Sequence, residues 1–129
     1  MKSKFIVKQR QLYNSLTPCH CPAIQEVVRF TADGWNHLVF DERRPRSHSE
    51  QHYRVGLINH LADIISNATT AVQKVIPGKK ICYLWVLTGE ITDNRGDKAV
   101  VKIILRKIGA GNTHFLSVMA KKNKRKPRV

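Results

Sequence analysis

The sequence lacks long apolar runs, and we therefore expect no segment that would place it in a membrane or carry it across one. No run approaches the roughly 20 consecutive apolar residues of a transmembrane helix. The apolar stretch near the amino terminus, Phe5-Ile6-Val7, ends after three residues, whereas a secretory signal contains an apolar region of about 7–15 residues. We therefore expect a cytoplasmic protein with no membrane partner.

Cysteine is scarce as well. The three cysteines are an odd number, which argues against a disulfide framework. Cys19 and Cys21 flank His20 in a Cys-His-Cys-Pro run with the spacing of half a zinc site, but Cys82 has no neighbouring ligand that would supply the other half. We therefore expect this run to be a short connecting loop, and we expect no bound metal or other cofactor.

Acidic residues are few and scattered. Nine Asp and Glu stand against 23 Lys and Arg, which gives a formal net charge of +14 and a sequence pI near 10.2. Glu90, Asp93 and Asp97 lie near one predicted turn but lack a metal-binding spacing, whereas a metal-dependent nuclease needs converging carboxylates. The excess of positive charge favours a polyanionic partner, with RNA as the first candidate.

Part of the positive charge lies in a tail. Residues 121–129 form a basic segment, separate from a single folded domain over residues 1–120. The domain stays basic without the tail. In the tail we expect phosphate contacts from Lys121, Lys122, Lys124 and Arg125.

Hydrophobic periodicity predicts helices in the first half of the chain. Helical spacing of apolar residues covers 3–16 and 49–67, and Ser47 with Glu50 has the spacing of a capping box at the start of the second helix. Between them, Asp33-Gly34 separates two apolar runs and predicts a β-hairpin over residues 26–40.

Strand patterns fill the second half. Three strand-like runs, at 81–88, 99–108 and 113–119, are joined by short turns and predict an antiparallel meander. The stretch 69–76 fits a helix or a strand equally well. The fold class is therefore α+β, with N-terminal helices packed on a four-stranded antiparallel sheet made of the meander plus one strand.

The predicted strand 99–108 carries two bases on one side. Lys102 and Arg106 alternate with Val101, Ile103 and Leu105, so the bases lie on the face opposite the core. The Gly-Ala-Gly-Asn turn then brings His114, at the start of the next strand, within reach of any phosphate that these bases hold.

A second cluster follows the predicted hairpin. His37 is followed by a loop that contains Arg43, Arg44 and Arg46. Trp35 and Phe40 offer aromatic surface on which a nucleobase could stack, although a core position is the more typical one for Phe40.

These residue types suit RNA cleavage without a metal. That reaction needs a base for the 2′-OH proton, cations for the charged phosphorane and an acid for the leaving oxygen. Histidine serves both proton-transfer roles near neutral pH, and Arg or Lys serves the electrostatic role.

The chain also resembles a nuclease family. Gly-Trp-Asn-His-Leu-Val-Phe at 34–40, an Arg-rich loop before a long helix, and the closing hairpin at 102–119 with its His-Phe-Leu-Ser stretch are similar to phage-type nucleases of the barnase, EndoU, colicin and RelE-like (BECR) superfamily. The resemblance covers roughly residues 26–120. It implies an α+β fold, RNase activity without metal, and an occurrence as toxins beside antitoxins or in phage and mobile elements.

Carried over residue by residue, the resemblance implies an active site made of His37, Arg43, Arg44, Arg106, His114 and Ser117. Lys102, Arg46 and Trp35 would contact RNA beside it. Which of these groups acts as the base stays open.

Three hypotheses follow for function. The first is an endoribonuclease acting on single-stranded RNA, tRNA or ribosome-bound mRNA. The second is a basic RNA- or DNA-binding protein without catalysis. The third, compatible with the first, is a basic surface that binds an acidic antitoxin or inhibitor protein.

Overall fold

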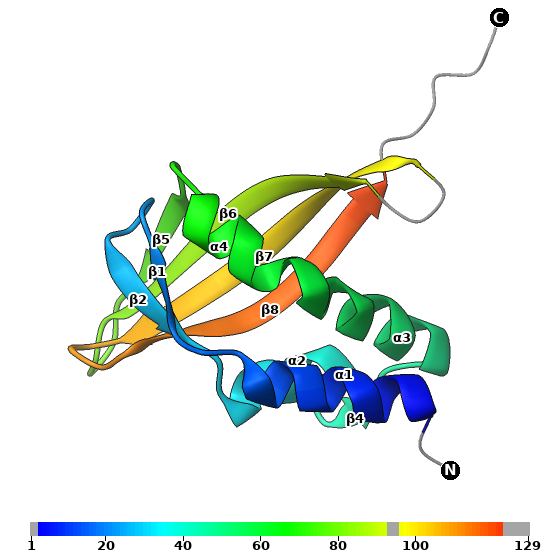
Figure 1. Cartoon of the computed structure of the whole chain (residues 1–129). Helices are drawn as coiled ribbons and strands as arrows, with labels where there is room; N and C mark the ends of the chain where they lie inside the picture. The colour runs from blue at the N-terminus through cyan, green and yellow to red at the C-terminus, as the bar shows by residue number, and fades with distance from the viewer. Residues whose placement is uncertain (1–2, 93–95, 123–129) are drawn as a thin grey trace, which may run out of the picture.

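The computed structural model describes residues 3–92 and 96–122 of the 129-residue chain, and it has the expected α+β class. A curled six-stranded sheet carries the helices on one of its faces (Figure 1). The helical elements are α1 (Lys4–Ser15), α2 (Ala32–Val39), α3 (His48–Gly56), the 3-10 helix η1 (Leu57–His60) and α4 (Leu61–Asn67). The strands are β1 (Cys19–Cys21), β2 (Glu26–Arg29), β3 (Phe40–Asp41), β4 (Arg44–Pro45), β5 (Val72–Ile76), β6 (Cys82–Thr92), β7 (Lys98–Ile108) and β8 (Thr113–Lys122).

The sheet is larger than the four strands predicted from the sequence. Its order is β1-β2-β8-β7-β6-β5, and β5 to β8 form an antiparallel meander. The predicted meander is thus confirmed, and the undecided stretch 69–76 supplies its first strand, β5. The two additional strands come from the β1–β2 hairpin, which joins through a short parallel pairing of Val28 and Arg29 with Thr113 and His114.

The pairing of β7 with β8 contains one irregularity. Leu105 lies opposite Phe115, but Ile104 lies opposite Ser117, so Leu116 is one residue more than the ladder needs. Such a β-bulge bends the strand that carries it.

The predicted hairpin over residues 26–40 is wrong. Its first half is β2, which pairs with β1 instead, so the Cys-His-Cys run is a strand rather than a loop. Its second half is helix α2, whose buried face holds Gly34, Trp35 and Leu38. Because this face is spaced for a helix and packs on β8, helical packing outweighs the Asp-Gly turn signal.

Gly34 serves close packing, not a turn. A Cβ built on Gly34 would lie 2.6 Å from the ring of Phe115, 2.7 Å from the carbonyl oxygen of Phe115 and 2.5 Å from the hydroxyl of Tyr13. The backbone of α2 therefore rests directly against β8. The Tyr13 hydroxyl is itself fixed there, because it donates a 2.6 Å hydrogen bond to the carbonyl of Thr31.

The predicted helix over 49–67 is confirmed, and it consists of three consecutive helical segments, α3, η1 and α4 (Figure 1). It starts as the capping pattern predicts, since the Ser47 hydroxyl accepts a 3.2 Å hydrogen bond from the backbone N–H of Glu50. At the other end α4 approaches β6 closely: a Cβ on Gly89 would lie 2.8 Å from Ile64.

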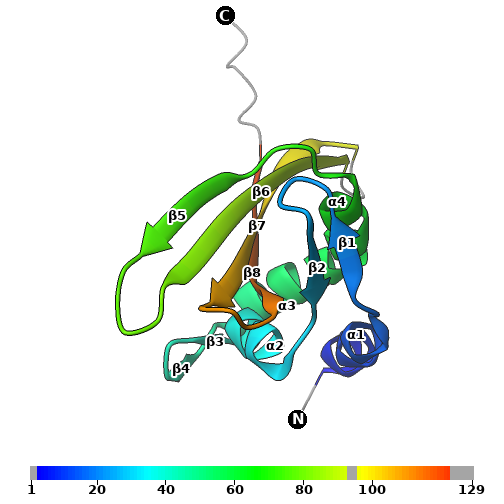
Figure 2. The same ribbon diagram turned by 90° about the vertical axis from the view of Figure 1, so that its left-hand side faces the viewer.

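The two faces of β7 differ as predicted. Val101, Ile103 and Leu105 are fully buried against the helical layer, whereas Lys102 is exposed and Arg106 is half-buried on the opposite face. Figure 2 shows that the helices lie to one side of the meander, with β5 and β6 extending beyond them.

Side chains of α3 cover the edge of β8 beyond its pairing with β2. The Tyr53 hydroxyl donates to the carbonyl of Ala120, and the Arg54 guanidinium donates to the carbonyl of Val118 at 3.1 Å. These contacts occupy backbone acceptors that an open strand edge would otherwise present to another chain.

A candidate active site at the start of strand β8

The start of β8 brings together residues from one helix and two strands. Asp33 lies on α2, Arg106 on β7 and His114 on β8, directly opposite Arg106 in the ladder. The Arg106 guanidinium lies 3.7 Å from the Asp33 carboxylate, and its Nη2 and Nε lie 3.2 Å and 3.3 Å from Nε2 of His114. Arg106 thus links the helix to the strand.

His37 belongs to the same cluster. It follows Asp33 by four residues on α2, so both side chains lie on one face of the helix. Burial lowers the pKa of His37, and the nearby guanidinium of Arg106 lowers it further, while the Asp33 carboxylate opposes the shift. A lowered pKa keeps the imidazole neutral at physiological pH, which is the form that accepts a proton.

Two further arginines border His37. The Nε of Arg46 donates a 3.1 Å hydrogen bond to the carbonyl of His37. Arg54 reaches β8 from α3, where its guanidinium lies 3.5 Å from the Ser117 hydroxyl and forms a 2.7 Å ion pair with Glu50. Both guanidinium groups contribute to the lowered pKa of His37. The cluster therefore combines a neutral imidazole with a surplus of fixed positive charge, an arrangement suited to a phosphate group.

The structure brings together five of the residues proposed from the sequence, namely His37, Arg46, Arg106, His114 and Ser117. These five, together with Asp33 and Arg54, form the candidate active site, to which we give the name catalytic cluster. Of the other cations, Lys102 lies four residues before Arg106 on the same face of β7. Lys121 is exposed near the end of β8. Lys122 is the last residue described, and Lys124, Arg125 and Asp93 lie outside the described residues.

Arg43 and Arg44 lie apart from the contacts of the cluster. Both are exposed at the turn of the β3–β4 ribbon, beside α2 at the lower end of the sheet (Figure 2). They line a hollow with Asp41 and Glu42, and Glu42 adopts a left-handed backbone conformation at φ 56°. None of the hydrogen bonds or ion pairs found among residues 3–92 and 96–122 joins them to the cluster, so their predicted catalytic role has no support from contacts.

Trp35 and Phe40 differ in burial from what the sequence indicates. Trp35 is only 4% exposed and belongs to the core, so its predicted role as an open stacking surface for RNA is wrong. The cause is its place on the buried face of α2. Phe40, for which the sequence favours a core position, is 40% exposed at the end of that helix.

Sequence reasoning missed Asp33 and Arg54. The Asp-Gly signal places Asp33 in a hairpin turn, which hides its four-residue spacing from His37. That spacing becomes meaningful once residues 32–39 are recognised as a helix, for which Trp35, Leu38 and Val39 provide the apolar pattern. Arg54 carries no local signal, because only the packing of α3 against β8 gives it a role.

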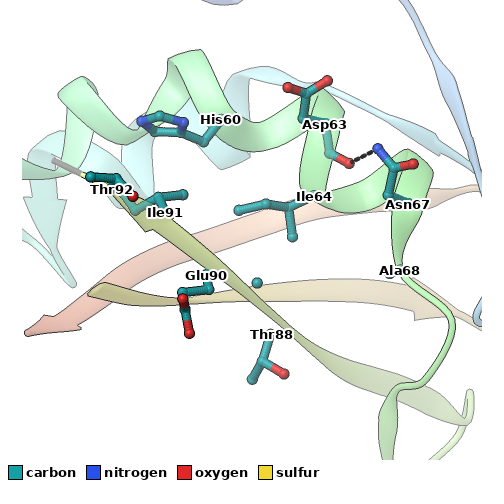
Figure 3. Close-up of a pocket in the computed structure, with 10 residues that line it drawn as sticks. His60, Asp63, Ile64, Asn67, Ala68, Thr88, Glu90, Ile91 and Thr92 are labelled. Atoms are coloured by element: carbon teal, nitrogen blue, oxygen red, sulfur yellow. Dashed lines mark hydrogen bonds between the residues drawn. The ribbon is translucent and has the colours of Figure 1, made fainter. Parts of the chain in front are cut away.

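A groove elsewhere on the molecule does not bring several charged side chains together. It lies between α4 and β6 and has a volume of about 410 Å³. Figure 3 shows that the Asp63 side chain projects away from the strand, whereas Thr88 and Glu90 extend from the opposite side of β6. Within residues 3–92 and 96–122, no group of three or more His, Cys, Asp or Glu side chains is placed to hold a metal ion.

The three cysteines are free thiols, and burial raises the pKa of both Cys19 and Cys21. Their thiol form is thereby favoured over the thiolate that would bind a metal.

No protein-family model, curated protein or solved structure matches this chain. In the part of the chain that is described, no helix has the length and apolar character needed to span a membrane.

Proposed function

We propose that the protein is a metal-independent endoribonuclease of the cytoplasm. The observation that carries the proposal is the catalytic cluster, in which Arg106 lies between the helix bearing His37 and the strand bearing His114. In line with the resemblance to BECR nucleases, we propose that it acts as a toxin of a toxin–antitoxin, phage or mobile-element system on tRNA or mRNA. An acidic antitoxin or inhibitor would then be its protein partner.

The proposed reaction begins at the ribose 2′-hydroxyl. Neutral His37 removes the 2′-OH proton, and the 2′-oxygen forms a bond to phosphorus. Arg106 and Arg54 stabilise the negative charge of the phosphorane. The bond from phosphorus to the 5′-oxygen then breaks, and protonated His114 gives its proton to that oxygen. The products are a 2′,3′-cyclic phosphate and a 5′-hydroxyl.

The contact between Arg106 and His114 fits this sequence of steps. In the free protein His114 accepts hydrogen bonds from Arg106, which requires Nε2 to be unprotonated. As the proposed acid, His114 has to gain a proton at Nε2 before the 5′-oxygen leaves. Protonation then ends the acceptor role of Nε2 and releases the Arg106 N–H groups to the phosphate.

Cleavage in excess EDTA tests the proposed function. We expect the purified protein to cut tRNA or total RNA in EDTA and to leave 2′,3′-cyclic or 3′-phosphate ends, because the proposed chemistry uses side chains alone. The measurement is gel analysis of the fragments with identification of their 3′ ends. Cleavage that EDTA abolishes, or fragments with 3′-hydroxyl ends, would contradict the proposal.

One alternative function is non-catalytic binding of RNA or DNA. It is favoured by the exposed Lys102 and Lys121 on the face of the meander that carries Arg106. RNA that stays intact but is shifted on a native gel, with an affinity that falls steeply with salt, would support this alternative.

The pH dependence of cleavage should report His37. Because its pKa is lowered, kcat/KM is expected to stay high somewhat below the ordinary histidine pKa and to fall only as more acidic solution protonates His37. Asp33→Asn removes the carboxylate that raises this pKa, so the acidic limb should move to still lower pH. The profile is measured on wild type, Asp33→Asn and the control Asp63→Asn on α4; an acidic limb that is the same in all three would argue against His37 as the base.

A further inference from the structure

A second cleft lies beside the catalytic cluster, between α1 and α2. Its volume is about 510 Å³, within the range of roughly 300–1,000 Å³ found for small-molecule sites. Ile6 and Val7 line it from α1, while Trp35, Val39 and Phe40 line it from α2 and the start of β3. The cleft therefore has an apolar floor that can take a flat, poorly hydrated group.

The polar groups around this floor are carboxamides, bases and the hydroxyl of Ser3. Gln11, Asn14 and Asn36 bring amide groups, and Arg10 and His48 bring ring or guanidinium nitrogens. Among the described residues its lining contains no Asp or Glu, whereas the α4–β6 groove contains two carboxylates. Amides both donate and accept hydrogen bonds, as the edge of a nucleobase requires, and the absence of carboxylates suits a ligand joined to phosphates.

Two side chains are placed to hold a planar ring. The Phe40 ring, 40% exposed, is open to stacking. Arg10 lies over the buried indole of Trp35, with its guanidinium carbon 5.2 Å from the ring centroid. An arginine held in this way keeps N–H groups available for a base edge or a phosphate.

The cleft shares two lining residues with a hollow at the catalytic cluster. Asn36 and Phe40 line the cleft, and they also line a smaller hollow of about 240 Å³ whose other lining residues are Asp33, His37 and Glu42. A nucleotide chain with one phosphate at His37 would therefore need only to cross Asn36 and Phe40 for a neighbouring base to enter the cleft.

We infer that this cleft is a subsite for one base of single-stranded RNA, next to the phosphate that is cut. The base stacks on Phe40, and the amide of Asn36 contacts its edge. The inference rests on the proposed function for the position of the scissile phosphate. Double-stranded RNA would not fit, because its bases are paired and stacked on one another.

The test is a binding experiment that does not depend on catalysis. A short fluorescent 2′-O-methyl RNA oligonucleotide has no free 2′-hydroxyl and cannot be cleaved, so its affinity can be measured by fluorescence anisotropy. Phe40→Leu should weaken binding about tenfold through loss of base stacking. Making one nucleotide of the oligonucleotide abasic should weaken binding to wild type by a similar factor and add little to the effect of Phe40→Leu.

Matched variants separate a local effect from a general one. Phe5, on α1, has an exposed aromatic ring that stacks on His52 and does not line the cleft. The Phe5→Leu variant should therefore bind the oligonucleotide like wild type. Asn36→Asp should weaken binding more than Asn59→Asp, which adds the same charge on η1. Affinities for Phe40→Leu and Asn36→Asp that equal those of their controls would overturn the subsite.

The subsite and the proposed function fail separately. If RNA is never cut but Phe40→Leu weakens oligonucleotide binding, the subsite stands and the ribonuclease proposal does not. If RNA is cut in EDTA while Phe40→Leu leaves both KM and oligonucleotide affinity unchanged, the ribonuclease stands and the subsite does not.

Discussion

Replacing His114 by alanine is expected to lower the rate of RNA cleavage by about 10²–10⁴-fold while RNA affinity changes little, because a general acid contributes about that much to a rate. The loss should appear in kcat, since the proton is transferred during the chemical step and not on binding. Cleavage is measured at saturating RNA, and affinity is measured with a non-cleavable 2′-O-methyl oligonucleotide.

A histidine outside the catalytic cluster provides the control for this variant. His60 lines the groove between α4 and β6, and His60→Ala should cut RNA at the wild-type rate. If His114→Ala also cuts normally, the start of β8 is not the active site. If its affinity for RNA collapses together with its rate, His114 binds substrate and does not act as the acid.

Gly34→Ala is expected to destabilise the folded protein by about 3 kcal/mol, at the upper end of typical overpacking costs. In most helices this change is favourable by about 0.5–1 kcal/mol. Here the added Cβ would lie 2.5–2.7 Å from the Tyr13 hydroxyl and from both the ring and the backbone oxygen of Phe115. Backbone cannot move aside as a flexible side chain does, so the steric cost outweighs the gain in helix propensity.

Chemical denaturation measures this effect, and Gly56→Ala is the matched control. Gly56 is the last residue of α3, where the nearest atom to a new Cβ is Cζ of Phe5 at 3.8 Å, an ordinary contact distance. That variant should be as stable as wild type or slightly more stable. A Gly34→Ala protein as stable as Gly56→Ala would mean that α2 does not rest on β8 as described.

The sequence predicts the meander well because its information is local. Strands β6, β7 and β8 alternate core and surface residues, and a short Gly-containing turn between β7 and β8 places Arg106 opposite His114. Those two members of the catalytic cluster can therefore be paired from the sequence alone. For β5 the sequence is ambiguous, because all five of its residues are exposed at the edge of the sheet.

The rest of the catalytic cluster depends on contacts between distant parts of the chain. His37 lies close enough to Arg106 for the guanidinium to lower its pKa only because α2 packs against β8, and Arg54 reaches Ser117 only because α3 lies along the edge of that strand. The Asp-Gly pair also misleads, since a strong turn signal here lies in the first turn of a helix. Spacing along the sequence could not reveal that either pair of residues lies close together.

The extra residue in β8 has a consequence for how a strand can build a site. Side chains of a regular strand alternate between its two faces, so residues an odd number apart point in opposite directions. His114 and Ser117 are three apart, yet they lie opposite Arg106 and Ile104, which share one face of β7. The extra residue, Leu116, shifts the alternation of side chains between the two faces of the strand by one position. As a result Phe115 and Val118 both enter the core, and the imidazole and the hydroxyl both face outward, an arrangement that an unbroken ladder cannot produce.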